Sequence, residues 1–119
     1  MKISGNMSKY NKKISFFEIL SNIPSNNAKW YIFEFDAIGK APNNLTMSEF
    51  EDLVLKSKYG YQMSWNELLK FSKEIEDINN LILVSSTSPV EFDAIETDTE
   101  DFLVRLEIDD STFWELEFY

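Results

Sequence analysis

The sequence predicts a single α+β domain: a mainly antiparallel sheet of four to five strands, about three helices and a C-terminal β-hairpin. The chain has 119 residues, the length of one domain, and is 44% hydrophobic and 15% aromatic, which is enough to form a core. Stretches with helical spacing of apolar residues alternate with stretches of strand-like alternation. We expect this domain over residues 13–119, after a flexible basic arm over residues 1–12 that is rich in Ser, Asn and Lys.

Three helices are predicted from the pattern Ser/Thr-x-x-Glu, in which each side chain caps the backbone N–H group of the other residue. The predicted helices cover residues 15–23, 46–58 and 64–78. The second helix has two candidate starts, because Thr46 with Glu49 and Ser48 with Glu51 both match the pattern. Apolar residues three and four positions apart give each helix one face to bury.

The clearest strand is Ala28–Asp36, which is rich in aromatic and β-branched residues. Simple alternation places Tyr31, Phe33 and Phe35 on one face, and Trp30 and Ile32 on the other. Apolar residues on both faces indicate a central strand. Two shorter strands are expected at 81–84 and 90–95.

The C-terminal hairpin is predicted from two alternating runs, 102–108 and 112–119. Matching their apolar faces requires an odd number of loop residues. A loop of residues 109–111 would pair Leu106 with Trp114 and would place Arg105 opposite Glu115. This loop type prefers Gly at its left-handed position, so a longer loop remains an alternative.

The composition excludes several classes of function. The chain has no Cys and no His, so disulfides, thiolate zinc sites and the commonest general base are absent. Its three Gly residues form no phosphate-binding loop. No apolar run is long enough for a signal peptide or a membrane span, and we expect a soluble, cytoplasmic protein. We expect no catalytic residue, cofactor or bound metal, and neither nucleic acid nor membrane as a partner.

The formal net charge of −10 is concentrated at one end of the chain. Residues 91–119 carry one Arg and eleven acidic residues, whereas residues 1–30 carry five Lys and one Glu. Such asymmetry indicates an interaction surface for a cationic partner, although solubility alone also explains an acidic surface. The expected partner-binding residues are Asp93, Glu96, Asp98, Glu100, Asp101, Asp109, Asp110, Phe113, Glu115 and Glu117.

Two other interpretations of the acidic residues are weaker. Glu96, Asp98, Glu100 and Glu107 repeat the spacing of calcium ligands in an EF-hand, but the sixth position is Asp101, where the loop needs Gly. A pair of carboxylates can also perform acid–base hydrolysis. An acidic chain offers many such pairs, so the sequence does not single one out.

Three segments give the chain a resemblance to a known group of proteins. Residues 29–35, KWYIFEF, residues 63–71, MSWNELLKF, and residues 111–115, STFWE, resemble bacterial immunity proteins encoded beside contact-dependent or polymorphic toxins. The resemblance implies a cytoplasmic inhibitor that binds a cognate toxin domain one to one and occludes its active or substrate-binding site. Many such toxins are nucleases, whose basic surfaces suit an acidic inhibitor. The alternatives are an acidic regulatory adaptor unrelated to toxins and a small carboxylate-based hydrolase.

Overall fold

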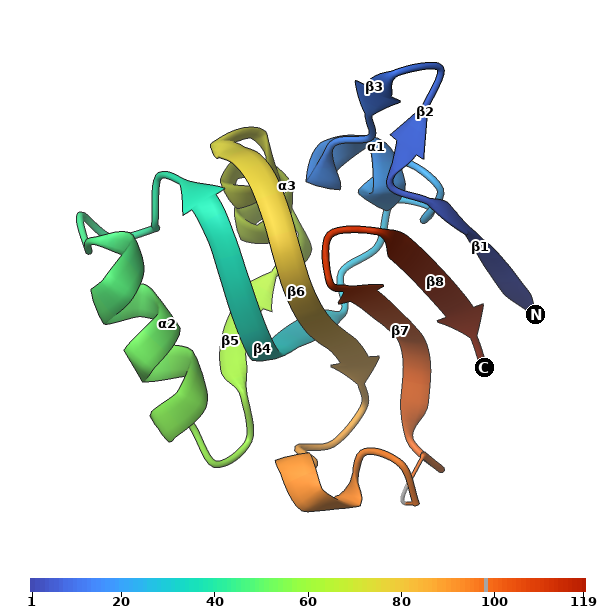
Figure 1. Ribbon diagram of the computed structural model, residues 1–119. Coiled ribbons are helices and arrows are strands. Elements are labelled where there is room, and N and C mark those ends of the chain that lie inside the picture. The colour runs from blue at the N-terminus through green and yellow to red at the C-terminus, as the bar shows by residue number, and fades with distance from the viewer. Residues whose placement is uncertain (98) are drawn as a thin grey trace.

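The computed structural model describes residues 1–97 and 99–119 and confirms the α+β class (Figure 1). A six-stranded antiparallel sheet has the order β1-β8-β7-β6-β4-β5, and β2 and β3 form a separate hairpin. The strands are β1 (Lys2–Asn6), β2 (Ser8–Lys9), β3 (Lys12–Lys13), β4 (Lys29–Gly39), β5 (Tyr61–Ser64), β6 (Ile75–Ser86), β7 (Phe102–Asp109) and β8 (Phe113–Phe118). The helices are α1 (Phe16–Leu20), α2 (Met47–Lys56), α3 (Trp65–Lys73) and the 3-10 helix η1 (Phe92–Ala94).

All three predicted helices begin at a capping box. The side chains of Ser15, Thr46 and Ser64 each accept a hydrogen bond from the backbone N–H three residues later. The Glu carboxylate at that position accepts a hydrogen bond from the backbone N–H of the capping residue. The second helix therefore starts at the first of its two candidate boxes. None of the helices in the described residues is long and apolar enough to span a membrane.

The third helix ends at Lys73, five residues before its predicted end, because the chain turns there into the long strand β6. Ile75 and Ile78 belong to this strand, and their side chains are buried. Their spacing of three residues fits a helix, but it also fits a strand whose pairing is irregular. Gly39 of the neighbouring β4 makes the turn sterically feasible. Its φ is +147°, and a Cβ there would lie 2.3 Å from the carbonyl oxygen of Glu74.

Strand β4 is central, as predicted, but its faces do not follow simple alternation. The pairing with β6 shifts between Ile32 and Glu34, which marks a β-bulge around Phe33. The bulge moves Phe35 to the same face as Trp30 and Ile32, where all three join the main core under the helices. The predicted grouping of Phe35 with Tyr31 and Phe33 is therefore wrong.

Aromatic rings join the helices to the sheet. The ring centroid of Phe50, in α2, lies 5.5 Å from the ring centroid of Phe35, 5.2 Å from that of Phe71 and 5.0 Å from that of Tyr61. Phe50 is completely buried, so one side chain contacts β4, β5 and α3 at once. Strand β5, which contributes Tyr61, is absent from the sequence prediction because its four residues show no distinctive pattern.

The expectation of a flexible arm over residues 1–12 is wrong. Lys2–Asn6 forms β1, which pairs with β8 along its length at the edge of the sheet. Met7 follows with none of its surface exposed, and Ile3 packs against the main core. Ile3 and Met7 are isolated among polar residues, so the sequence pattern did not predict a strand here. Their packing in the main core nevertheless holds the segment against the domain.

The expected strand over 90–95 is also wrong, since this segment pairs with no strand and contains η1. The hairpin over 102–119 is confirmed, but its register differs by two residues: Leu106 lies opposite Leu116, and Arg105 opposite Glu117. The apolar faces stay matched. The loop is displaced because the backbone of Ser111 donates a hydrogen bond to the carbonyl of Asn79, a distant contact that local pattern does not encode.

Phe50→Ala tests the aromatic contacts between helices and sheet. Removing a fully buried ring leaves a cavity, so we expect the free energy of unfolding to fall by about 3–5 kcal/mol. Leu55→Ala on the same helix is the control, because Leu55 is 73% exposed and its loss should cost less than about 0.5 kcal/mol. Urea denaturation measures both values, and equal losses would contradict the assigned packing.

Candidate functional site

The face of the sheet opposite the helices carries a second, smaller apolar cluster. Tyr31 and Phe33 of β4 and Val84 of β6 form its base, while Val90 and Ile95 cover it from the segment 87–101. Phe92, on η1, places its ring 6.2 Å from that of Phe33. This acidic segment is therefore held against the sheet by buried apolar side chains, although it forms no strand.

Polar contacts fix both ends of this segment. The backbone N–H of Thr87 donates to the carbonyl of Asp101 over 3.0 Å, and the Ser88 hydroxyl donates to the Asp101 carboxylate over 2.5 Å. Glu91 forms an ion pair of 3.3 Å with Lys58 from the loop after α2. The acidic side chains are thus presented from a backbone with defined contacts.

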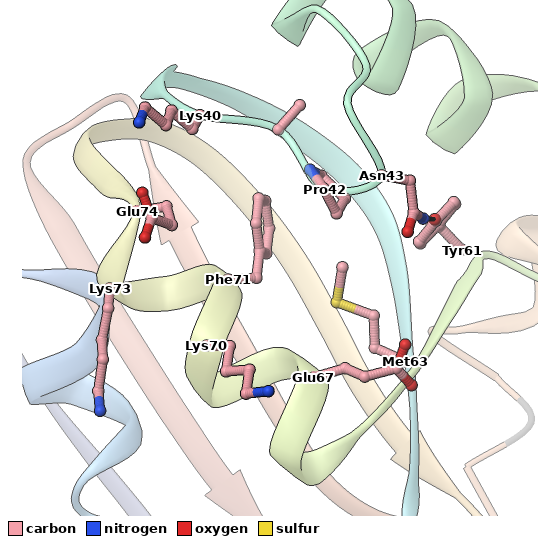
Figure 2. Close-up of a pocket in the computed structure, with 11 residues that line it drawn as sticks. Lys40, Pro42, Asn43, Tyr61, Met63, Glu67, Lys70, Phe71, Lys73 and Glu74 are labelled. Carbon is pink, nitrogen blue, oxygen red and sulfur yellow. Dashed lines mark hydrogen bonds between the residues drawn. The ribbon is translucent and has the colours of Figure 1, made fainter.

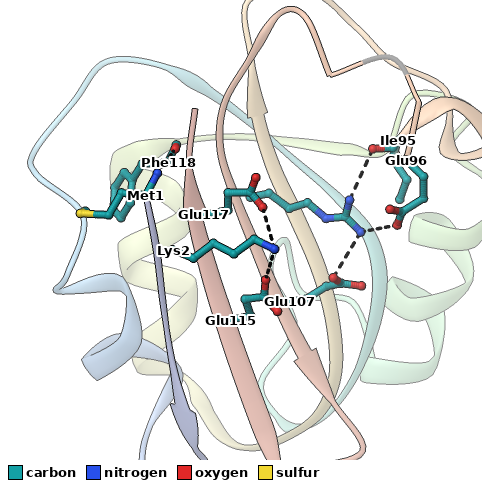
Figure 3. Close-up of polar contacts among 9 residues, drawn as sticks. Met1, Lys2, Ile95, Glu96, Glu107, Glu115, Glu117 and Phe118 are labelled. Atoms are coloured by element: carbon teal, nitrogen blue, oxygen red, sulfur yellow. Dashed lines mark hydrogen bonds and ion pairs between the residues drawn. The ribbon is translucent and has the colours of Figure 1, made fainter.

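Arg105 on β7 connects the segment to the strands through Ile95, Glu96 and Glu107, which are labelled in Figure 3. Its guanidinium donates to the carbonyl of Ile95 over 3.4 Å and to the carboxylate of Glu96 over 2.6 Å, and it lies 3.2 Å from the carboxylate of Glu107. The residue is 91% buried by its neighbours, with 9% of its surface exposed. A buried guanidinium requires such partners, because an unpaired charge there would be strongly destabilising.

A second cation lies beside this network. Lys2, on the edge strand β1, places its ammonium 3.0 Å from Glu115 and 3.6 Å from Glu117 of β8 (Figure 3). The side chain of Lys2 remains 61% exposed, so the pairs are screened by water and contribute little to stability. Their main effect is to reduce the repulsion between two neighbouring carboxylates.

The network shifts the pKa of three groups. A hydrogen bond from Arg105 lowers the pKa of the Glu96 carboxyl. Burial alone would lower the pKa of Arg105, but the bond to Glu96 and the charges of Glu107 and Glu96 outweigh it and raise that pKa. Burial, reinforced by the charge of Glu117, raises the pKa of the Tyr119 phenol. At neutral pH, Glu96 is charged and hydrogen-bonded.

The structure brings most, but not all, of the expected binding residues together. We define the acidic face as the exposed or partly exposed carboxylates of the segment and the adjoining strands: Asp93, Glu96, Glu100, Asp101, Glu107, Glu115 and Glu117. Asp109, Asp110 and Phe113 lie instead at the hairpin turn. That turn is roughly 24 Å along β7 from Phe102, but it is only two residues from Glu107 and Glu115 of the acidic face. Asp98, also expected here, is outside the described residues.

Sequence reasoning left several side chains of this region out of the predicted set. Phe92 and Tyr119 expose 48% and 49% of their surface among the carboxylates. Glu107 belongs to the acidic face. It lies between the apolar residues Leu106 and Ile108 of β7, and this alternation indicates a side chain on the opposite face of the strand. The role of Lys2 depends on β1, which has no sequence signal of comparable strength.

The chemistry of these carboxylates is that of paired, ionised groups. Four of them line a shallow depression of about 130 Å³ together with Lys2 and Arg105: Glu96, Glu107, Glu115 and Glu117. A hydrolytic general acid needs a raised carboxyl pKa, whereas the pKa of Glu96 is lowered. Among residues 1–97 and 99–119, no three Asp or Glu side chains are arranged to hold a metal ion. The geometry suits recognition of cationic groups on a partner.

The bond between Glu96 and Arg105 predicts a pH dependence of stability. Because folding lowers the pKa of Glu96, the bond stabilises the protein fully above the unfolded-state pKa of about 4.3. That stabilisation is lost as the pH falls through the lower folded-state pKa. We expect Glu96→Gln to be less stable than wild type near neutral pH and equal to it near about pH 3 in urea denaturation.

Glu100→Gln is the matched control, because within the described residues Glu100 has no cation in ion-pair range. A stability difference between Glu96→Gln and wild type that stays constant with pH would contradict the assigned bond.

Comparisons with known proteins add no assignment to this geometry. No family model, no curated protein and no solved structure matches the chain. The function is therefore inferred from the acidic face itself.

Proposed function

We propose that the chain is an immunity protein, which binds the cationic domain of a cognate toxin, most simply a nuclease, and neutralises it by occlusion. The observation that supports this most is the composition of the acidic face. Four of its seven carboxylates pair with the two cations Lys2 and Arg105, and within the described residues the other three have no cation in ion-pair range. The remaining negative charge is available to a partner.

The electrostatics of such a face favour a basic partner. Clustered carboxylates produce a negative potential that accelerates the encounter with a cationic surface, most strongly at low salt. A nuclease presents Lys and Arg where it binds phosphates, and carboxylates of the inhibitor can occupy those positions. Such binding excludes the nucleic acid without any chemical step.

Apolar side chains give the face a means of tight binding beyond charge. Phe92 and Tyr119 are large, and each is about half exposed among the carboxylates. Buried aromatic residues often dominate the binding energy of protein interfaces, while the surrounding charges set rate and specificity. Tyr119 is held by its ring contact with Phe102, at 5.5 Å between centroids, so little entropy is lost on binding.

A triple substitution tests the proposal: Asp93→Asn, Glu100→Gln and Asp101→Asn. These residues are exposed, and Asn at position 101 retains an oxygen that can accept the hydrogen bond from Ser88. The partner for the test is the one that the proposal predicts, the C-terminal domain of a secreted protein encoded immediately upstream. We expect its association rate at low salt to fall roughly tenfold, with weaker protection of cells that express both proteins.

The matched control carries Asp36→Asn, Asp52→Asn and Glu76→Gln, which remove the same charge from exposed positions outside the acidic face. It should bind and protect as wild type does. Equal rates for wild type and both variants would remove the acidic face from the mechanism. Normal binding by wild type to a different, non-toxic protein, without affinity for the toxin, would favour the adaptor alternative.

A further inference from the structure

A larger cavity lies on the opposite, helical side of the sheet (Figure 2). It has a volume of about 400 Å³ and lies between α3, β5 and the loop 40–43 that follows β4. Ligand-binding cavities in proteins typically enclose roughly 300–1,000 Å³. No residue of the acidic face lines this cavity, so it is a separate feature of the molecule.

The cavity arises from the way the two longer helices are seated. Helix α2 packs on β4, whereas α3 packs on α1 and β5. The helices meet through the rings of Phe50 and Phe71 deep in the core, and the loop 40–43 crosses above that contact. The space that remains is open to solvent at the mouth.

The lining of the cavity is mostly apolar at its base. Phe71, Met63 and Pro42 surround the space, and Tyr61 lies at its far side (Figure 2). The amide of Asn43 donates a hydrogen bond to the Tyr61 hydroxyl oxygen over 2.8 Å, which helps to position the ring. A flat apolar group fits such a base, because aromatic rings and a thioether offer contact area without competing hydrogen-bond donors.

The charged groups around the mouth differ in how they are engaged. Lys73 turns away, with its ammonium 4.9 Å from the ring centroid of Phe17. Glu67 accepts the backbone N–H of Ser64 over 3.0 Å as part of the helix cap, which lowers its pKa.

Two lysines at the mouth have no such engagement. Within the described residues, neither Lys40 nor Lys70 has a carboxylate within 4.0 Å, although Glu74 also lines the cavity. In a chain with a net charge of −10, this mouth is a place where unpaired cations outnumber unengaged carboxylates.

We infer that this cavity binds a flat, apolar organic anion of the aromatic carboxylate class. The ring system would lie against Phe71 and Met63, and the carboxylate would pair with Lys70 or Lys40 at the mouth. Desolvation of the ring supplies most of the binding energy, and the lysines select the charge. The inference does not depend on the proposed function, because the two sites lie on opposite faces of the sheet.

Titration with 2-naphthoate, followed by two-dimensional NMR of the full chain, tests the inference. We expect saturable shifts of the amide signals of Tyr61, Met63 and Phe71. At least one of Lys70→Gln and Lys40→Gln should weaken binding by roughly threefold to fivefold, as expected for a partly exposed ion pair. Lys56→Gln is the charge-matched control, because Lys56 is on α2 and outside the cavity, and its affinity should equal that of wild type.

Two further probes isolate the role of charge. The neutral 2-naphthalenemethanol should bind wild type more weakly than 2-naphthoate, and it should bind wild type and Lys70→Gln equally. Stronger binding of the cationic 2-naphthylmethylamine would overturn the assignment of an anion. Absence of saturable shifts in the cavity, or equal naphthoate affinity in wild type and both cavity lysine variants, would overturn the site.

Discussion

The structure depends on a strand pair, β4 with β6, that must bury apolar residues on both of its faces. The bulge at Phe33 makes this feasible, because it sends Phe35 to the helical side while Tyr31 and Phe33 stay on the other. On the helical side, Phe35 completes the ring cluster that seats α2 and α3. On the other side, Tyr31 and Phe33 form the base on which the segment 87–101 packs.

The same constraint places the negative charge. Eleven acidic residues among residues 91–119 repel one another, and apolar packing of Val90 and Ile95 has to offset that repulsion. Arg105 and Lys2 reduce it further by pairing with four of the carboxylates. The segment is therefore held in place without full neutralisation, which is the condition for an acidic face that can act on a partner.

Local patterns predicted the helix starts, the central strand and the C-terminal hairpin well, but they predicted the edge strands and the distant contacts poorly. The three helix starts follow from side chains three residues apart, and all three are correct. The end of α3, the hairpin register and the strand β1 depend on contacts with remote residues: Gly39 against Glu74, Ser111 with Asn79, and β1 along β8. For the same reason the acidic residues could be counted from the sequence, whereas the pairing of Lys2 with Glu115 and Glu117 could not be predicted from it.

The cavity between α3 and β5 had no sequence signal, because its lining comes from separate segments, each of which looks like ordinary core or surface. The most direct test of the central claim is the footprint of a bound partner. Hydrogen–deuterium exchange should be measured on the protein alone and in complex with the toxin domain that the proposal predicts. The account predicts added protection in the segment 87–101 and in β8, with α2 and α3 unchanged. Protection confined to the helical side would contradict a binding role for the acidic face.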